Sequence, residues 1–267
     1  MAEMRVRERG RAKAGSWLAE LRPAMVEPVA RVVALPHAGA GPNALMPLLS
    51  CLPDDHEVLG VTLPGRERRF TEGYPEGPQD PAPIVEAIVG ELAALPTRPT
   101  VLFGHSMGVA LAVAVALARP ELCNALVLSA HPPAGARAER AGEWDEETLL
   151  KIIKLGGGTP DEILENAFWR GYLIGLLRSD LGLAGTLVRR NLAGRLALPL
   201  TVLGGTHDEL VDPPELAGWI RRTDARVRFR LLPGGHFYLM DEPHRRIVAA
   251  EIARAVSPAA AARPYEP

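Results

Sequence analysis

Cysteine is scarce in this chain, with Cys51 and Cys123 the only two among 267 residues. They form neither a Cys-x-x-Cys pair nor a metal-binding spacing, so the sequence predicts no disulfide framework and no metal site. Two separate thiols are typical of a reducing compartment, and we expect a cytoplasmic protein in which these side chains serve packing.

Long apolar runs and an excess of one charge are also missing. No stretch of about 18 uncharged apolar residues occurs, so no membrane span is predicted, and the charged segment 1–22 lacks the apolar core of a signal peptide. The formal net charge is −2, which gives no reason to expect nucleic acid or an anionic membrane as a partner. With 47% hydrophobic residues the chain is expected to form one globular domain with a large core.

What the sequence does contain is an alternation of apolar β-type runs with helical runs. Strands are predicted at residues 29–35, 56–63, 101–103, 125–129, 200–203 and 226–232. Helices are predicted at about 42–52, 84–95, 109–117, 213–222 and 242–256. The alternation favours an α/β fold with a mostly parallel central sheet and helices on both faces, over residues 28–256. Residues 1–27 are interpreted as a flexible leader with room for one short helix, and residues 257–267 as a disordered tail.

The alternation breaks between about residues 132 and 197. This segment has no strand pattern and three helical ones, at residues 146–155, 161–177 and 181–192. An insertion at this point of the chain would sit above the carboxyl ends of the strands, so it is interpreted as a helical lid; a second helical layer with only a packing role is the alternative.

Residues 104–108, Gly-His-Ser-Met-Gly, lie between a β-type run and an Ala- and Val-rich helical run. A Gly-x-Ser-x-Gly pattern in this setting is typical of a nucleophile elbow, a sharp strand-to-helix turn that exposes one serine hydroxyl. Ser106 is therefore the candidate nucleophile, and a Cβ at Gly104 or Gly108 would crowd the flanking strand or helix. Because the five-residue pattern also occurs in ordinary turns, the assignment depends on an acid and a histidine that follow in that order.

Two later loops supply the acid and the histidine. Asp208 directly follows its strand, whereas Asp212 precedes two prolines as a helix N-cap would, so Asp208 is favoured. His236 follows the last strand in a glycine turn and is favoured as the base over His207, which adjoins the acid, and over His244, which is expected at the surface. A neutral imidazole would accept the serine proton while the carboxylate fixes its tautomer.

An oxyanion hole needs backbone N–H groups placed in advance. The Met107 amide, which begins the helix after the nucleophile, is one candidate, and the Ala38 amide in the glycine-rich loop after strand 29–35 is the other. The candidate substrate contacts are His37, Gly39, His105 and Phe237. Of these, His37 could equally brace its loop, and His105 fits packing beside the elbow better than chemistry.

Five segments of the domain carry a specific combination of motifs. They are Pro36-His37-Ala38-Gly39, Leu63-Pro64-Gly65-Arg66-Glu67-Arg68-Arg69, Gly104-His105-Ser106-Met107-Gly108, Asp208 in Gly-x-x-Asp-x-x-Val, and Gly234-Gly235-His236-Phe237-Tyr238-Leu239. Over about residues 28–256 this set resembles the type II thioesterases of polyketide and nonribosomal peptide assembly lines, which are α/β-hydrolases. The match departs from the family in residues 40–43, which lack an aromatic continuation, and in a longer leader.

The resemblance implies a stand-alone editing hydrolase. Such an enzyme removes stalled or wrong acyl groups from the phosphopantetheine arm of a carrier protein. The resemblance assigns Ser106, His236 and Asp208 as the catalytic triad and the Ala38 and Met107 amides as the oxyanion hole, with no metal and no cofactor of the enzyme's own.

The resemblance also implies an acyl or peptidyl carrier protein, acidic around its modified serine, as a transient partner. Arg66, Arg68, Arg69, Arg137 and Arg140 are candidates to receive it, with a solvated surface charge as the alternative for each. Four residues of the insertion are candidates for an acyl chamber or, equally, for the insertion's own core: Leu149, Ile152, Leu173 and Leu176.

Two other functions remain open. The same triad could serve an esterase, or an acyltransferase or cyclase in which an alcohol or amine replaces water. A ligand-binding protein on a hydrolase scaffold is disfavoured, because all three members of the triad are present.

Overall fold

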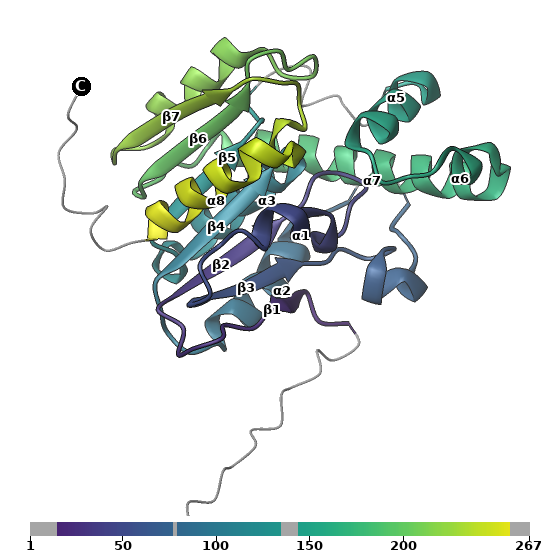
Figure 1. Cartoon of the computed structure of the whole chain (residues 1–267). Coiled ribbons are helices and arrows are strands. Elements are labelled where there is room, and N and C mark those ends of the chain that lie inside the picture. Colours follow the sequence, from purple (N-terminus) through teal and green to yellow (C-terminus); the bar gives the residue numbers. More distant parts are fainter. Residues whose placement is uncertain (1–14, 77–78, 135–143, 257–267) are drawn as a thin grey trace, which may run out of the picture.

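A seven-stranded β-sheet forms the central layer of this protein (Figure 1). The computed structural model describes residues 15–76, 79–134 and 144–256. The spatial order is β1-β3-β2-β4-β5-β6-β7, and each neighbouring pair is parallel except β1 with β3. This confirms the mostly parallel sheet. The strands are β1 (Leu18–Arg22), β2 (Ala30–Leu35), β3 (His56–Val61), β4 (Thr100–His105), β5 (Ala125–Ser129), β6 (Leu200–Gly205) and β7 (Val227–Leu232).

The inner strands are apolar throughout because both faces of the sheet are covered. Along β2, Val33 and Leu35 belong to the core cluster on one face, and Val32 and Ala34 to the cluster on the other. Successive side chains of a strand point to opposite faces, so one short strand contributes to both cores.

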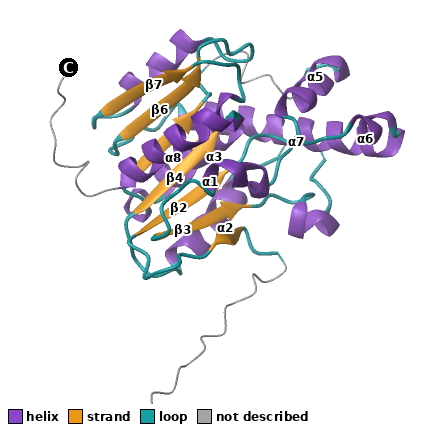
Figure 2. Cartoon of the chain, viewed as in Figure 1, coloured by secondary structure: helices purple, strands orange, loops and turns teal. Residues whose placement is uncertain are grey.

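Helices cover both faces, as predicted (Figure 2). The cluster on one face includes side chains of α2, α3 and the second half of α7 (Ala167–Asn191). The cluster on the other face includes side chains of α1 and α8. The helices outside the insertion are η1 (Pro42–Leu45), α1 (Met46–Leu49), η2 (Glu67–Glu72), α2 (Ala82–Ala93), α3 (Met107–Ala118), η3 (Pro120–Leu122), η5 (Pro213–Arg222), η6 (Tyr238–Met240) and α8 (Glu242–Val256), where η denotes a 3-10 helix.

Strand β1 corrects the interpretation of residues 1–27 as a leader. It pairs antiparallel with β3, with Leu18 opposite Val61, and the Glu91 carboxylate on α2 accepts hydrogen bonds from the Trp17 and Leu18 amides, both at 2.8 Å. Five residues of mixed polarity at a sheet edge show no clear alternation, which is why the pattern predicts no strand there. Residues 1–14 and the predicted tail 257–267 lie outside the described residues.

Two predicted helices are instead built largely from 3-10 turns. Residues 42–52 form η1 and the four-residue α1, and residues 213–222 form η5. Pro47 lacks an N–H and would lie inside an α-helix that began at residue 42, so it prevents one long α-helix there. Pro213 and Pro214 stand in the first turn of η5, where proline is tolerated, and do not explain its 3-10 form.

The insertion contains α5 (Glu146–Gly156), α6 (Asp161–Glu165) and α7 (Ala167–Asn191), and α5 and α6 lie at one side of the molecule (Figure 1). The predicted break between the helices at residues 178–180 is wrong, because these three residues lie inside α7, which is 25 residues long without interruption. The break falls instead at Asn166, whose side chain caps α7 by accepting from the Phe168 and Trp169 amides at 3.0 and 3.2 Å. No helix in the described part of the chain is long and apolar enough to span a bilayer.

The close packing of the turn around Ser106 generates a stability prediction. A methyl group at Gly108 would lie 2.0 Å from the backbone carbonyl oxygen of Leu35, whereas one at Gly90, exposed on α2, would meet nothing within 4 Å. Gly108→Ala is therefore expected to lower the free energy of unfolding by about 1–3 kcal/mol or more, because backbone must shift. The matched Gly90→Ala should raise it by roughly 0.5–1 kcal/mol through helix propensity. Urea unfolding checks both, and equal effects at the two sites would contradict the close packing described for the turn.

Candidate active site

Ser106 lies in the turn between the end of β4 and the first residue of α3. Its φ and ψ are 53° and −125°, a region that residues with a side chain rarely adopt. The Ser106 amide donates to the Ser129 carbonyl at 2.8 Å and so ties the turn to β5. The strand, strained serine and helix are the arrangement that the Gly-x-Ser-x-Gly pattern predicts.

The structure brings Ser106, Asp208 and His236 together in two hydrogen bonds. His236 Nδ1 lies 2.8 Å from Asp208 Oδ2, and His236 Nε2 lies 2.9 Å from Ser106 Oγ. An ionised carboxylate can only accept, so Nδ1 carries the hydrogen and Nε2 is free to accept from the serine hydroxyl. The arrangement can therefore remove a proton from Ser106 and stabilise the resulting imidazolium.

The carboxylate of this group is itself held in place. Asp208 Oδ1 accepts from the Leu210 and Val211 amides at 2.8 and 3.0 Å, and the side chains of Asp208 and His236 are only 2% and 5% exposed. Because both oxygens are engaged, the carboxylate presents a fixed face to the imidazole.

The competing acid and histidines lie elsewhere. Asp212 is the N-cap residue of η5, and exposed His207 contacts the Thr206 hydroxyl at 2.9 Å. His244 is more buried than expected, with a side chain 13% exposed, and its Nδ1 donates to the Tyr238 carbonyl at 3.0 Å. None of these contacts involves Ser106.

The Ala38 and Met107 residues line the same cavity as Ser106 and His236. The Met107 amide is the first in α3, among the N–H groups that a helix leaves without an internal partner. Gly39 also lines the cavity, but its amide donates to the Asp180 carboxylate at 2.7 Å. Within the 37–39 loop, Ala38 therefore remains the better candidate oxyanion donor.

The predicted substrate contacts separate into two groups. His37, Gly39 and Phe237 line the cavity. His105 does not: it is fully buried and its Nδ1 lies 3.0 Å from the Ser129 hydroxyl, which contradicts a role in contacting substrate and fits the packing alternative. Its ring packs edge-on against His37, with centroids 5.8 Å apart.

The cavity beside Ser106 has a volume of about 630 Å³ and extends beneath the insertion. Of the four candidate chamber residues, Ile152 and Leu173 line it, whereas Leu149 and Leu176 do not. Leu149 is fully buried and packs within the small core of the insertion. An apolar wall on α5 and α7 next to a serine hydroxyl suits a substrate with a hydrocarbon portion.

The basic segment 66–69 does not form the exposed surface expected for docking. Arg66 and Arg69 are buried, at 6% and 4% exposure, and are bonded to Asp180 and Glu72. Arg68 donates to the Ser16 carbonyl at 2.8 Å. These desolvated groups are structural, so the docking assignment is wrong for Arg66 and Arg69.

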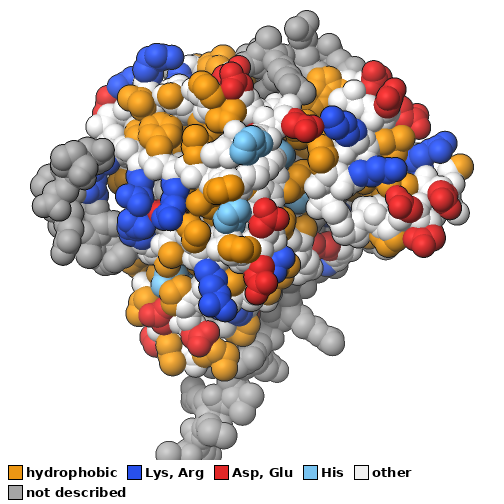
Figure 3. Space-filling model, turned by 45° about the horizontal axis from the view of Figure 1, so that its top comes forward, with side chains coloured by type: hydrophobic (Ala, Val, Ile, Leu, Met, Phe, Trp, Pro, Cys, Tyr) orange, Lys and Arg blue, Asp and Glu red, His pale blue; other side chains and the backbone are white. Residues whose placement is uncertain are grey.

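The other two basic candidates, Arg137 and Arg140, lie outside the described residues. On the face shown in Figure 3, basic and acidic side chains are interspersed. Within residues 15–76, 79–134 and 144–256, no group of three or more His, Cys, Asp or Glu side chains is arranged to hold a metal ion.

Asp180 is a residue of the site that is absent from the sequence-based candidates. It interrupts the apolar stripe of α7, three residues after Leu177 and three before Leu183, both buried. A lone acid on the buried face of an amphipathic helix requires a buried partner, which is the signal that could have revealed it.

Comparison with known proteins identifies relatives over most of the chain. A family model described as a thioesterase domain matches residues 30–256. A probable cadicidin biosynthesis thioesterase of Streptomyces griseus is 34% identical over 254 residues, which cover 93% of this chain and 68% of that protein. The gramicidin S biosynthesis protein GrsT of Aneurinibacillus migulanus is 27% identical over 81% of this chain and 86% of its own length. Among solved structures, the type II thioesterase BorB from the borrelidin cluster is similar with a TM-score of 0.71 and 27% identity, over 90% of this chain and 98% of that one. These similarities agree with the α/β-hydrolase fold.

The histidines around the site generate a pH prediction. Burial, with a smaller effect of His236, lowers the pKa of His37 from 6.5 to about 3. Burial likewise lowers the pKa of His131 to about 4 and that of His105 well below its usual value. Unfolding releases these imidazoles to take up protons below about pH 6.5, so the folded state is expected to lose stability as the pH falls from 6.5 toward 4, by up to about 1.4 kcal/mol per pH unit for each histidine.

Urea unfolding at several pH values between about 5 and 7.5 measures this slope. His131→Gln is expected to reduce it by close to one proton. A slope unaffected by His131→Gln, or a protein that grows more stable toward pH 5, would show that these imidazoles are not held neutral by folding.

Proposed function

The chain belongs to the thioesterase domain family, hydrolases that act on thioesters, and on that premise we propose that it is a stand-alone type II thioesterase of polyketide or nonribosomal peptide biosynthesis. Its substrate is an acyl group on the phosphopantetheine arm of an acyl or peptidyl carrier protein, which is released by hydrolysis. The observation that carries the proposal is the His236 imidazole hydrogen-bonded to both Ser106 and Asp208.

The proposed first step is acylation of the serine. Ser106 Oγ attacks the thioester carbonyl while His236 Nε2 takes its proton, and the Ala38 and Met107 amides donate to the oxyanion that forms. As the tetrahedral intermediate collapses, the C–S bond breaks and His236 returns the proton to the departing sulfur. A thiol with a pKa of about 8.5 leaves readily, so this step needs little help from a general acid.

The second step transfers the acyl group from Ser106 to water. His236 takes a proton from the attacking water, the same amides receive the new oxyanion, and the serine leaves with the proton that His236 returns. The products are a free carboxylic acid and the unchanged enzyme. Deacylation therefore needs no group beyond those of the first step.

The surroundings of the site support the substrate class. Ile152 and Leu173 line the cavity from α5 and α7, and burying an acyl chain against them would stabilise binding by about 0.8 kcal/mol for each methylene. The insertion then acts as a lid, and the carrier protein is a transient partner. A cytoplasmic location is part of the proposal, because Cys51 and Cys123 are free thiols and such thiols are typical of a reducing compartment.

The function is tested with a panel of acyl groups loaded on one carrier protein. The intact mass of the carrier is followed over time, and free acid and transfer products are quantified. We expect loss of the acyl mass with an equal amount of free acid for at least part of the panel. Little free acid from every thioester would contradict hydrolysis, and formation of an ester or amide with an added acceptor would favour the acyltransferase instead.

Substitutions of the three bonded residues test the mechanism. Ser106→Ala and His236→Ala are expected to lower kcat/KM by about 10⁴-fold or more, and Asp208→Asn by about 10⁴-fold because the tautomer is lost. Asp212→Asn and His207→Ala, which leave the triad contacts untouched, should change it by less than about twofold. Circular dichroism checks that each variant is folded. Hydrolysis of thioesters by folded Ser106→Ala at an appreciable rate would refute Ser106 as nucleophile.

A further inference from the structure

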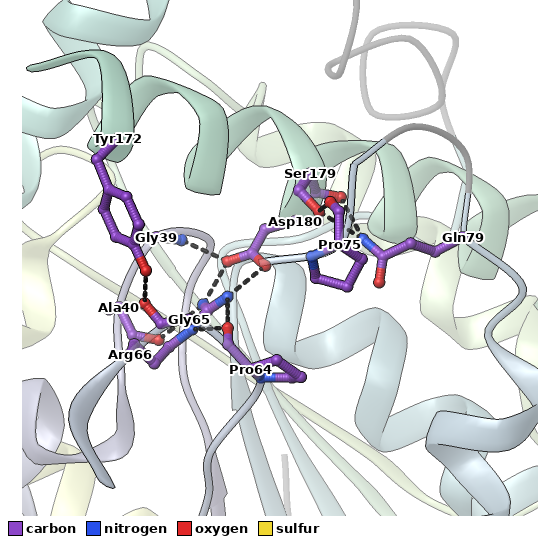
Figure 4. Close-up of polar contacts among 10 residues, drawn as sticks. All are labelled: Gly39, Ala40, Pro64, Gly65, Arg66, Pro75, Gln79, Tyr172, Ser179 and Asp180. Carbon is purple, nitrogen blue, oxygen red and sulfur yellow. Dashed lines mark hydrogen bonds and ion pairs between the residues drawn. The ribbon is translucent and has the colours of Figure 1, made fainter. Parts of the chain in front are cut away.

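A buried carboxylate joins three segments next to the cavity (Figure 4). Asp180 on α7 is 2% exposed. Its Oδ2 accepts from the Gly39 amide and its Oδ1 from Arg66 Nη2, both at 2.7 Å. Arg66 also donates from Nη1 to the Ala40 carbonyl at 3.3 Å and from Nε to the Pro64 carbonyl at 3.3 Å. One ion pair therefore connects the insertion, the loop after β2 and the loop after β3.

Stability alone does not account for an ion pair at this position. Removing two charges from water offsets most of their attraction, so an apolar pair of similar volume is often as stable or more so. Leu183 and Leu187 of α7 already pack in the hydrophobic core of the domain. What an apolar pair could not supply is a directional acceptor for the Gly39 amide.

That amide belongs to the central peptide of a type II turn. The Ala40 amide donates to the His37 carbonyl at 3.2 Å, Gly39 has a φ of +81°, and Ala38 is not among the residues with positive φ. In a type II turn the central peptide, here Ala38–Gly39, is flipped relative to its orientation in a type I turn. Asp180 holds the N–H of this peptide and so selects the type II form.

We propose that Asp180, held by Arg66, is a positioning residue for the oxyanion hole. Asp180 holds the Gly39 amide, and its partner Arg66 holds the Ala40 carbonyl. Together they fix the 37–40 turn as a whole and, with it, the position of the Ala38 amide beside the cavity. Because Asp180 lies on α7, the oxyanion hole is complete only while this helix packs in the position observed. The position of the insertion therefore affects turnover. The inference rests on the proposed function of Ala38 and Ser106.

The neighbouring residue supplies a matched control. Ser179 Oγ donates to the Pro75 carbonyl at 2.7 Å and lies 2.6 Å from Gln79 Nε2, so it also attaches α7 to a loop of the domain. These contacts are separate from those of Asp180 with the turn (Figure 4). Ser179→Ala weakens the attachment of α7 without removing the acceptor for Gly39.

The test compares two variants. One is expected to keep its stability and lose turnover, and the other is expected to lose stability and keep more of its turnover. Arg66→Met combined with Asp180→Leu removes both charges and the acceptor, so the melting temperature should stay near that of the parent while kcat falls about 10- to 100-fold, with KM within about twofold. Asp180→Asn keeps an acceptor oxygen but leaves Arg66 without its carboxylate, so it should be less stable yet retain more of kcat. Ser179→Ala should keep kcat within about twofold.

A second measurement reports on the oxyanion hole directly. An alkylboronic acid forms a tetrahedral adduct with the serine that places an anionic oxygen in the hole. Its affinity should therefore fall in parallel with kcat in the double variant and remain unchanged in Ser179→Ala. If the double variant does not fold, Asp180→Ala compared with Asp180→Asn gives the same test, with kcat of the Asp180→Ala protein expected about tenfold lower.

Several outcomes overturn the inference. It fails if the folded double variant keeps kcat and boronic acid affinity within about twofold of the parent, or if Asp180→Asn and Asp180→Ala have equal kcat. Failure of the proposed function looks different: the parent protein would not hydrolyse carrier-bound thioesters at all, while the boronic acid comparison would still report whether Asp180 organises the hole.

Discussion

The two hydrogen bonds of the His236 imidazole set the main constraint on this molecule. They join residues 28 and 130 positions apart in the sequence, so they exist only if β4, β6 and β7 end at the same edge of the sheet. The parallel pairing of β4, β5, β6 and β7 provides this, because the loops that follow parallel strands lie at the same edge of the sheet. The apolar inner strands and the glycines beside Ser106 are therefore needed for the geometry of the site as well as for the fold.

Around this interaction, burial determines which side chains carry a charge and where the charged ones lie. Burial lowers the pKa of His37, His105 and His131. In the proposed mechanism these neutral rings add no further imidazolium to oppose the positive charge that would develop on His236. The buried ion pair of Arg66 with Asp180 is placed behind the 37–40 turn instead of beside the nucleophile. The pair bonds the Gly39 amide and the Ala40 carbonyl of that turn, while the cavity wall on α5 and α7 is apolar, which in the proposed function would suit an acyl chain.

The sequence predicts the part of the site that depends on chain order and strand ends, and does not predict the part that depends on tertiary pairing. Ser106, Asp208 and His236 each follow an apolar run, so their meeting can be anticipated. Asp180 and Arg66 are 114 positions apart, and nothing local distinguishes Arg66 from a solvent-exposed arginine. For the same reason residues 178–180 have the pattern of a break: Ser and Asp favour helix ends unless a distant partner satisfies them. Strand β1 is not predicted because a short strand at a sheet edge needs little alternation of apolar and polar residues.

In the mechanism proposed here, Ser106, activated by His236, carries the acyl group between the two steps. Rapid-quench measurement of the intact protein mass during a single turnover of an acyl thioester is the decisive experiment. The predicted result is a transient mass increase of one acyl group located on Ser106, which is absent in His236→Ala. Complete hydrolysis by the parent protein with no mass increase at any time, or with the acyl group on another residue, would contradict it.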